Sequence, residues 1–156
     1  MATRTPTRRR MAAAIASLTM VAALAPSALA AATVTRGDFH EFNGYGSTIT
    51  GRAQMVRTAD GRTIVSIHVE GLIPGLTYGA HVHAAACAAG LADGHYKFDP
   101  SGAATPPNEI WPGPFTANGG GVGNGDTIAE GTADGTAVSV VVHAPGGAKI
   151  ACADLS

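Results

Sequence analysis

The chain has 156 residues, a length that fits one domain, and its first 30 residues differ in composition from the rest. Without the four arginines of that first segment, six basic residues face eleven acidic ones, which gives a formal charge of −5. This balance argues against nucleic-acid binding, which calls for a basic stripe. No second hydrophobic span follows residue 30, so the sequence predicts no membrane anchor.

Residues 1–30 are predicted to be a secretory signal peptide. Arg4 and the arginines at 8–10 form a positive region, residues 11–25 are apolar, and the Ala-Leu-Ala at 28–30 predicts cleavage after Ala30. The arginines suit either the Sec route or the twin-arginine route. The alternative is an N-terminal amphipathic helix of the domain. We therefore expect residues 31–156 to form one exported domain, which is extracellular or periplasmic.

No helix is predicted from Thr33 onward, because glycine is abundant and short apolar runs alternate with turn signals. That pattern is typical of an all-β sandwich or barrel. The predicted strands cover residues 47–58, 63–69, 78–83, 127–130, 137–143 and 150–154. Asp60-Gly61 predicts a hairpin between the first two strands, and Asp134-Gly135 predicts another. In the second strand, Val65, Ile67 and Val69 share the face expected in the core.

Residues 84–126 form a long, weakly periodic stretch that is expected to be functional or tied down. Cys87 and Trp111 are the candidate anchors within it. The glycine run 119–125 predicts a flexible turn, since a phosphate-binding loop needs a following Lys-Ser/Thr and a helix. The only other cysteine is Cys152, and in an exported chain an even count favours a disulfide over free thiols.

Four of the six histidines form a candidate metal site. His81 and His83 share one strand face, because successive side chains of a strand point to opposite faces. His95 lies in the long loop, and His143 ends the valine-rich strand. Four imidazoles, or three with an open position, suit copper, and paired cysteines leave no thiolate. The alternative is a set of ordinary surface histidines. The histidines expected to have no such role are His40 and His68.

The order of these motifs resembles the copper/zinc superoxide dismutase family over roughly residues 50–155. The motifs that carry the resemblance are His81-Val82-His83, Cys87, Gly94-His95-Tyr96, Val141-Val142-His143 and Lys149-Ile150-Ala151-Cys152. The resemblance implies a Greek-key β-barrel with a long loop tied by a Cys87–Cys152 disulfide. It also implies one copper ion per subunit, held by the four histidines named above.

Three departures from the family pattern change the expected metal content and the expected charged residue of the site. In the family, the histidine that matches His95 bridges copper to zinc, but no histidine stands between His95 and His143 to complete a zinc site. The segment 144–148 is also too short for the family's charged guiding loop. The chain is therefore similar to copper-only members, and zinc is not expected. Lys149 stands where the family has an active-site arginine; it keeps the charge and loses the planar fork.

The expected reaction is disproportionation of superoxide to dioxygen and hydrogen peroxide, with His95 and Lys149 as the catalytic residues. Without zinc, the second nitrogen of His95 needs another partner, for which Glu109 is the first candidate and Asp99 the second. Two alternatives remain: a secreted copper-binding protein without useful turnover, and a structural or adhesion β-sandwich. A surface role is the alternative for Lys149 and for both carboxylates. A monomer or weak dimer is expected.

Overall fold

The computed structural model describes residues 1, 31–42, 48–89 and 92–156. Within these ranges the protein is all β and contains no helix. In the same described residues, no helix is long and apolar enough to cross a membrane. The predicted signal peptide lies outside the described residues except for Met1, and it stays a prediction.

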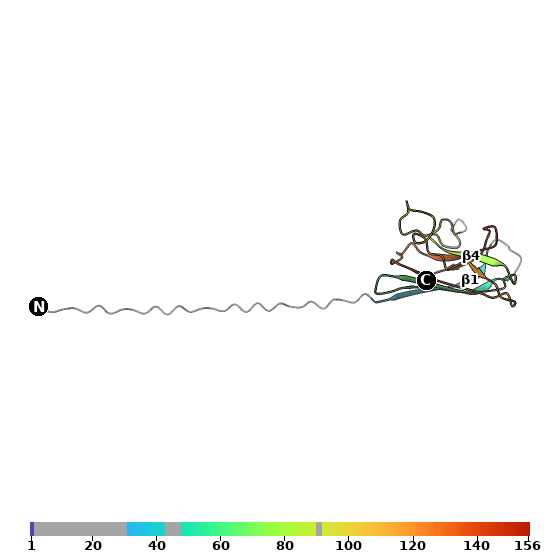
Figure 1. Ribbon diagram of the computed structural model, residues 1–156, viewed down its shortest axis with the longest axis horizontal. Helices are drawn as coiled ribbons and strands as arrows, with labels where there is room; N and C mark the ends of the chain where they lie inside the picture. The colour runs from blue at the N-terminus through green and yellow to red at the C-terminus, as the bar shows by residue number, and fades with distance from the viewer. Residues whose placement is uncertain (2–30, 43–47, 90–91) are drawn as a thin grey trace.

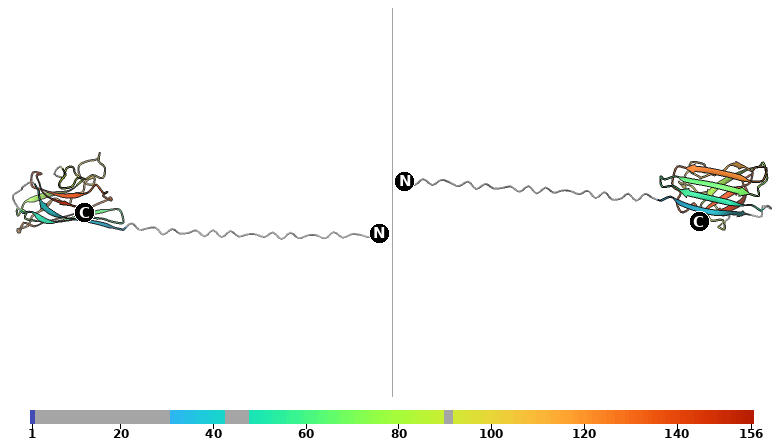
Figure 2. Two further views of the ribbon diagram at one scale, coloured as in Figure 1. Left: turned by 180° about the vertical axis from the view of Figure 1, so that it is seen from behind. Right: turned by 90° about the horizontal axis from the view of Figure 1, so that it is seen from below.

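In the part of the chain that the structure describes, eight antiparallel strands form two sheets, joined between β1 and β8, that face each other as the two layers of a nearly closed barrel (Figure 1). One sheet has the order β1-β2-β3-β6, and these strands lie side by side in the right-hand view of Figure 2. The other has the order β5-β4-β7-β8, with β8 joined to β1 and with β5 approaching β6 at the opposite seam. The bounds are β1 Thr33–Glu41, β2 Thr50–Arg57, β3 Thr63–Glu70, β4 Thr77–His83, β5 Phe115–Thr116, β6 Gly123–Ala129, β7 Ser139–His143 and β8 Lys149–Asp154.

The predicted β2–β3 hairpin is confirmed. The two strands pair in register around the turn at Asp60-Gly61, with Met55 opposite Val65. Val65, Ile67 and Val69 are buried and the residues between them are half-buried or exposed, as the alternation predicts. Local turn chemistry and a two-residue period are enough to specify this element.

The hairpin predicted at Asp134-Gly135 is wrong. Asp134 does form a turn, because its carboxylate accepts hydrogen bonds from the backbone N–H and the hydroxyl of Thr136. The strands on either side do not pair, however: β6 pairs with β3, and β7 pairs with β4 and β8. The connection crosses from one sheet to the other, which is the Greek-key step of the barrel.

The strands β1 and β5 were not predicted, and the glycine run is only partly a turn. β1 has few apolar residues and is held by pairing with β2 and β8. Gly123 and Gly125 belong to β6. Glycine is needed at both positions, because neighbouring groups leave no room for a side chain there. A Cβ on Gly123 would lie 2.2 Å from the Phe115 ring, and one on Gly125 would lie 2.0 Å from the carbonyl oxygen of Pro112. Glycine therefore permits close packing at this seam.

The central strand β7 is buried on both of its faces. All five of its residues are buried, as predicted for the valine run, and Val140 and Val142 point into the main core. Val141 points the other way and packs against the disulfide between Cys87 and Cys152. This disulfide is the expected one, and it ties the long loop over the outer face of β4, β7 and β8. The all-β barrel with a disulfide-tied loop is thus confirmed.

Candidate metal centre

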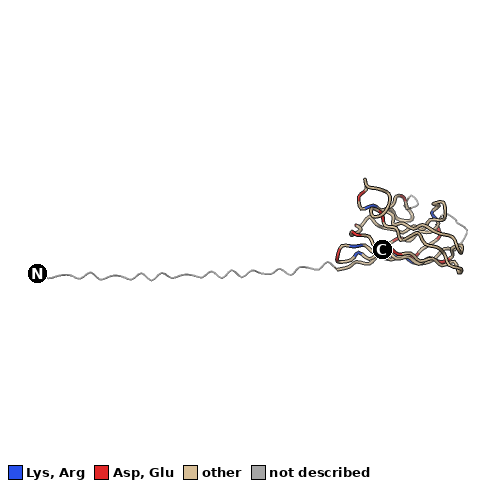
Figure 3. Tube along the Cα trace, in the orientation of Figure 1, with Lys and Arg blue, Asp and Glu red and all other residues tan. Residues whose placement is uncertain are grey.

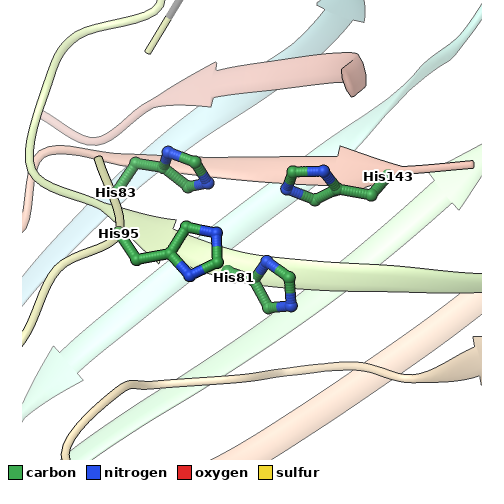
Figure 4. Close-up of side chains that lie close together, drawn as sticks. All are labelled: His81, His83, His95 and His143. Carbon is green, nitrogen blue, oxygen red and sulfur yellow. The ribbon is translucent and has the colours of Figure 1, made fainter. Parts of the chain in front are cut away.

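His81, His83, His95 and His143 lie together on the outer face of the β4–β7 pair, where their rings turn toward a common centre (Figure 4). One ligand nitrogen from each residue lies within 4.8 Å of the others. His81 and His83 share a face of β4 as predicted, and His143 ends β7 opposite Gly79 of β4. The four residues come from two strands and one loop.

The loop brings His95 to this face by bonding to the edge of β4. The N–H of Val82 donates to the carbonyl oxygen of Ile110 at 2.9 Å, and the carbonyl oxygen of Val82 accepts from the N–H of Tyr96 at 2.9 Å. His83 and His95 also pair as an isolated antiparallel bridge. Both backbone polar groups of Val82 are therefore satisfied by the loop, which fixes His95 beside His83.

Hydrogen bonds set the tautomers of three imidazoles. Nδ1 of His83 lies 2.6 Å from the carbonyl oxygen of Ala92, and Nδ1 of His143 lies 3.1 Å from that of Gly147. Nδ1 of His95 lies 2.8 Å from Oε2 of Glu109. Carbonyl and carboxylate oxygens only accept, so each Nδ1 carries a proton, and in the neutral form of each ring Nε2 keeps its lone pair.

The nitrogens that face the centre lack partners. Among the described residues, Nε2 of His83, Nε2 of His143 and Nδ1 of His81 are buried without a hydrogen bond. A buried polar atom without a partner costs about 1–3 kcal/mol, so three in one place call for an explanation. A metal ion among the converging lone pairs satisfies them, and a neutral imidazole set suits copper. The donors of this chain therefore fit a copper ion.

Burial keeps three of the candidate ligands neutral. Burial, with a smaller contribution from nearby imidazoles, lowers the pKa of His81 and of His83 to about 3. Burial likewise lowers the pKa of His143. These three imidazoles are neutral at pH 7, so a metal ion would not have to displace a proton from the nitrogen that it binds.

Glu109 forms the contact expected of the first candidate partner of His95. Its side chain is 1% exposed, and its Oε2 accepts hydrogen bonds from His95 and from the indole N–H of Trp111, the latter at 2.7 Å. Asp99, the second candidate, accepts from the N–H and hydroxyl of Ser101 within its own turn. Sequence reasoning expected Trp111 to anchor the loop and missed its position in the site, where its ring centroid lies 4.8 Å from that of His81.

Lys149 lies beside the cluster. Its Nζ donates to the carbonyl oxygen of Ala92 at 3.0 Å, and the same oxygen accepts from His83. The ammonium is close enough that its charge disfavours protonation of His83 and His143. His40 and His68 lie elsewhere and are exposed, as expected.

Solvent reaches the cluster from the side of His95. The His95 side chain is 29% exposed and lines a cavity of about 470 Å³, and Glu109 forms part of the same wall. Of the four histidines, only His95 lines this cavity, which therefore adjoins the cluster on one side.

Solved structures with this fold include superoxide dismutase 5 of Candida albicans. One structure, of a single-substitution variant, matches with a TM-score of 0.57 and 19% identity, covering 79% of this chain and 90% of the other. A Cu(II) structure of the same Candida protein matches with a TM-score of 0.54 and 18% identity, covering 78% of this chain and 90% of the other. No family model matches the chain, and no curated protein matches it in sequence. The superoxide dismutase-like barrel implied by the motifs is thereby confirmed as the fold.

Proposed function

We propose that this protein is a copper-dependent superoxide dismutase. The observation that carries the proposal is the convergence of four imidazoles, three of which have a buried, unpartnered nitrogen, on the outer face of the β4–β7 pair. The barrel is similar to that of the Cu(II) form of Candida albicans superoxide dismutase 5, which supports the same assignment.

The proposed ligands are His81 through Nδ1 and His83, His95 and His143 through Nε2, with one copper ion per chain. When bound, copper supplies the redox couple that takes one electron from a first superoxide and returns it, with two protons, to a second. The protein orients two of the four rings without the metal, because the backbone carbonyls of Ala92 and Gly147 bond to His83 and His143. Preformed ligands favour the metal without a costly rearrangement.

The proposed roles of the two other groups follow from charge. Lys149 places a positive charge beside the site and draws the superoxide anion toward it. Glu109 accepts the Nδ1 proton of His95, which fixes the tautomer and makes the ring a better donor. In the zinc-containing relatives that the motifs resemble, zinc binds this nitrogen. We propose that Glu109 takes that place and that zinc is not required.

The test is to measure copper content, zinc content and dismutation on one purified, oxidised sample. We expect one copper, no zinc and fast dismutation, with both copper binding and activity lost in a His81→Ala/His83→Ala variant. His68→Ala is the matched control, because His68 is also a strand histidine but lies on the other sheet. Wild-type activity no higher than that of the double variant would refute the proposed dismutase activity. Failure of the wild type to bind copper would favour a structural or adhesion role.

A copper-binding protein without useful turnover is the second candidate. The observation in its favour is Lys149, whose single ammonium is bonded to the carbonyl of Ala92 and lacks the planar fork with which an arginine orients an anion. This candidate predicts tight copper binding with weak dismutation. It also predicts that Lys149→Arg raises activity only modestly.

We also propose that residues 1–30 are removed on export and that residues 31–156 act outside the cytoplasm as a monomer or weak dimer. The Cys87–Cys152 disulfide supports an oxidising compartment. N-terminal sequencing of protein from the culture medium and from the periplasm should find Ala31 first. Full-length protein confined to the cytoplasm would contradict the export proposal.

A further inference from the structure

Trp111, the chain's single tryptophan, contacts His81 of the histidine cluster and also Glu109, the hydrogen-bond partner of His95. Its indole N–H donates to Oε2 of Glu109 at 2.7 Å, and its ring lies 4.8 Å from the ring of His81. We propose that Trp111 is a positioning residue of the metal centre, which orients His95 through Glu109 and supports His81 by direct contact. This inference rests on the proposed copper site.

The backbone explains why Trp111 faces the cluster. The segment that contains it lies along the edge of β4, since Val82 donates to Ile110 and Gly113 donates to Ala80 at 3.4 Å. Side chains alternate along an extended segment, so Glu109 and Trp111 share one face and Ile110 takes the other. Ile110 is 1% exposed and lies in the barrel core. The core residue thus sets the orientation of its two polar neighbours.

The carboxylate of Glu109 depends on two donors. Oε2 accepts from both His95 and Trp111, and Oε1 has no partner among the residues that the structure describes. A charge-assisted hydrogen bond constrains the direction of a buried carboxylate. With the indole removed, the Nδ1–H of His95 would be the only donor left to Glu109. The side chain could then turn toward another donor and take the His95 ring with it.

The ring of Trp111 contacts His81 directly. His81 differs from His83 and His143, because its Nδ1, rather than its Nε2, is the buried nitrogen without a partner. The indole packs on this ring at an interplanar angle of 48°. Trp111 therefore restrains two of the four proposed ligands, one by hydrogen bonding through Glu109 and one by packing.

The first experiment compares Trp111→Phe with Tyr96→Phe. The first change keeps a ring but removes the indole N–H. The control removes a hydroxyl in the same loop that accepts only from the N–H of Asp134 at 3.2 Å. We expect Trp111→Phe to weaken Cu(II) binding about 10-fold, the low end for outer partners of a metal site, and to shift the Cu(II) electron paramagnetic resonance spectrum. Tyr96→Phe should leave both unchanged.

The second experiment tests whether the effect passes through Glu109. In a Glu109→Leu background, Trp111→Phe should change Cu(II) affinity less than about 2-fold, because the hydrogen bond is already lost and the ring remains. An equal loss in both backgrounds would overturn the route through Glu109. If Trp111→Phe binds copper with the wild-type affinity and spectrum, the inference is wrong while the proposed function stands. If the wild type binds no copper, both fail.

A third measurement needs no change of Trp111. A single tryptophan produces one indole N–H resonance, whose hydrogen exchange in the copper-free protein reports the bond to Glu109. We expect this exchange to be slow in the wild type and at least about 10-fold faster in Glu109→Leu. Equal exchange rates would contradict the proposed bond even if Trp111→Phe failed to fold.

Discussion

The two sheets of the barrel have outer faces of opposite character. On β1-β2-β3-β6, charged side chains are solvated, as in the Arg52–Asp38 ion pair at 3.0 Å, and basic and acidic positions are interspersed (Figure 3). On β4-β7-β8, the long loop and its disulfide cover the sheet, and the outward residues of β4 and β7 include imidazoles, a serine and a valine. The strands alternate in the same way in both sheets, so the covering loop makes the difference.

Two strand histidines show what this difference does to chemistry. His68 lies on the solvent-exposed outer face of β1-β2-β3-β6, the open face. It bonds through Nδ1 to Asn124 and through Nε2 to Glu70, and these bonds raise its pKa. His83, under the loop, has its pKa lowered to about 3 by burial. The same side chain is thus a protonatable surface group on one sheet and a neutral nitrogen donor on the other.

The largest expected effect removes ligands from the covered face. His83→Gln with His143→Gln should weaken Cu(II) binding more than about 100-fold, beyond the range typical of outer partners. Competition with a chelator of known affinity measures this loss. His68→Gln, the same change on the open face, should have no effect on binding. Equal losses in the two proteins would show that the metal does not bind at the cluster.

The next effect releases the loop from the covered face. Cys87→Ser with Cys152→Ser opens a link between residues 65 apart in the chain, and the loop-entropy model gives a loss of about 4 kcal/mol in the free energy of unfolding. Urea unfolding of the copper-free protein measures it. A loss below about 1 kcal/mol would mean that packing, rather than the disulfide, holds the loop on β8.

A smaller effect concerns charge at the covered face. Lys149→Met should lower the rate of dismutation by about 10-fold and flatten its dependence on ionic strength, because an ammonium beside the site attracts the anionic substrate. Pulse-radiolysis rates at several salt concentrations measure both quantities. Arg52→Met removes a charge from the open face and is the control. A rate that keeps its full salt dependence in Lys149→Met would locate the attraction elsewhere.

The smallest effect concerns the pH dependence of the open face. The pKa of His68 in the folded protein lies above its unfolded value of about 6.5, so its stabilisation is fully present below pH 6.5 and is lost as pH rises through the folded pKa. Since the side chain is half exposed, His68→Gln should cost less than about 0.5 kcal/mol, and only at low pH. Urea unfolding at pH 5.5 and pH 9 measures it. A cost that grows with pH would reverse the assigned sign.

Much of the fold could be predicted because its signals are local. The β2–β3 hairpin follows from Asp60-Gly61 and the alternation of Val65 and Ile67, which lie close together in the chain. The same reasoning failed at Asp134-Gly135, where the turn forms but the flanking strands pair with others. Turn chemistry specifies a reversal of the chain, and it does not specify the partner of the next strand.

The candidate site divides in the same way. The shared face of His81 and His83 follows from the strand period, so their spacing alone predicts two donors on one side of a sheet. The bond between His95 and Glu109 joins residues 14 apart, and sequence reasoning could name Glu109 only as one of two candidate carboxylates. The position of Trp111 against His81 has no local signal, because it depends on where the loop bonds to β4.

The amino-acid sequence alone thus specified the candidate donor residues, the disulfide cysteines and the strand that carries the histidine pair, because residue type and two-residue periodicity are local properties. Folding in three dimensions settled which buried nitrogens lack partners, which carboxylate bonds to His95 and which aromatic ring contacts His81. Those features depend on backbone hydrogen bonds between the long loop and β4, which pair residues far apart in the chain.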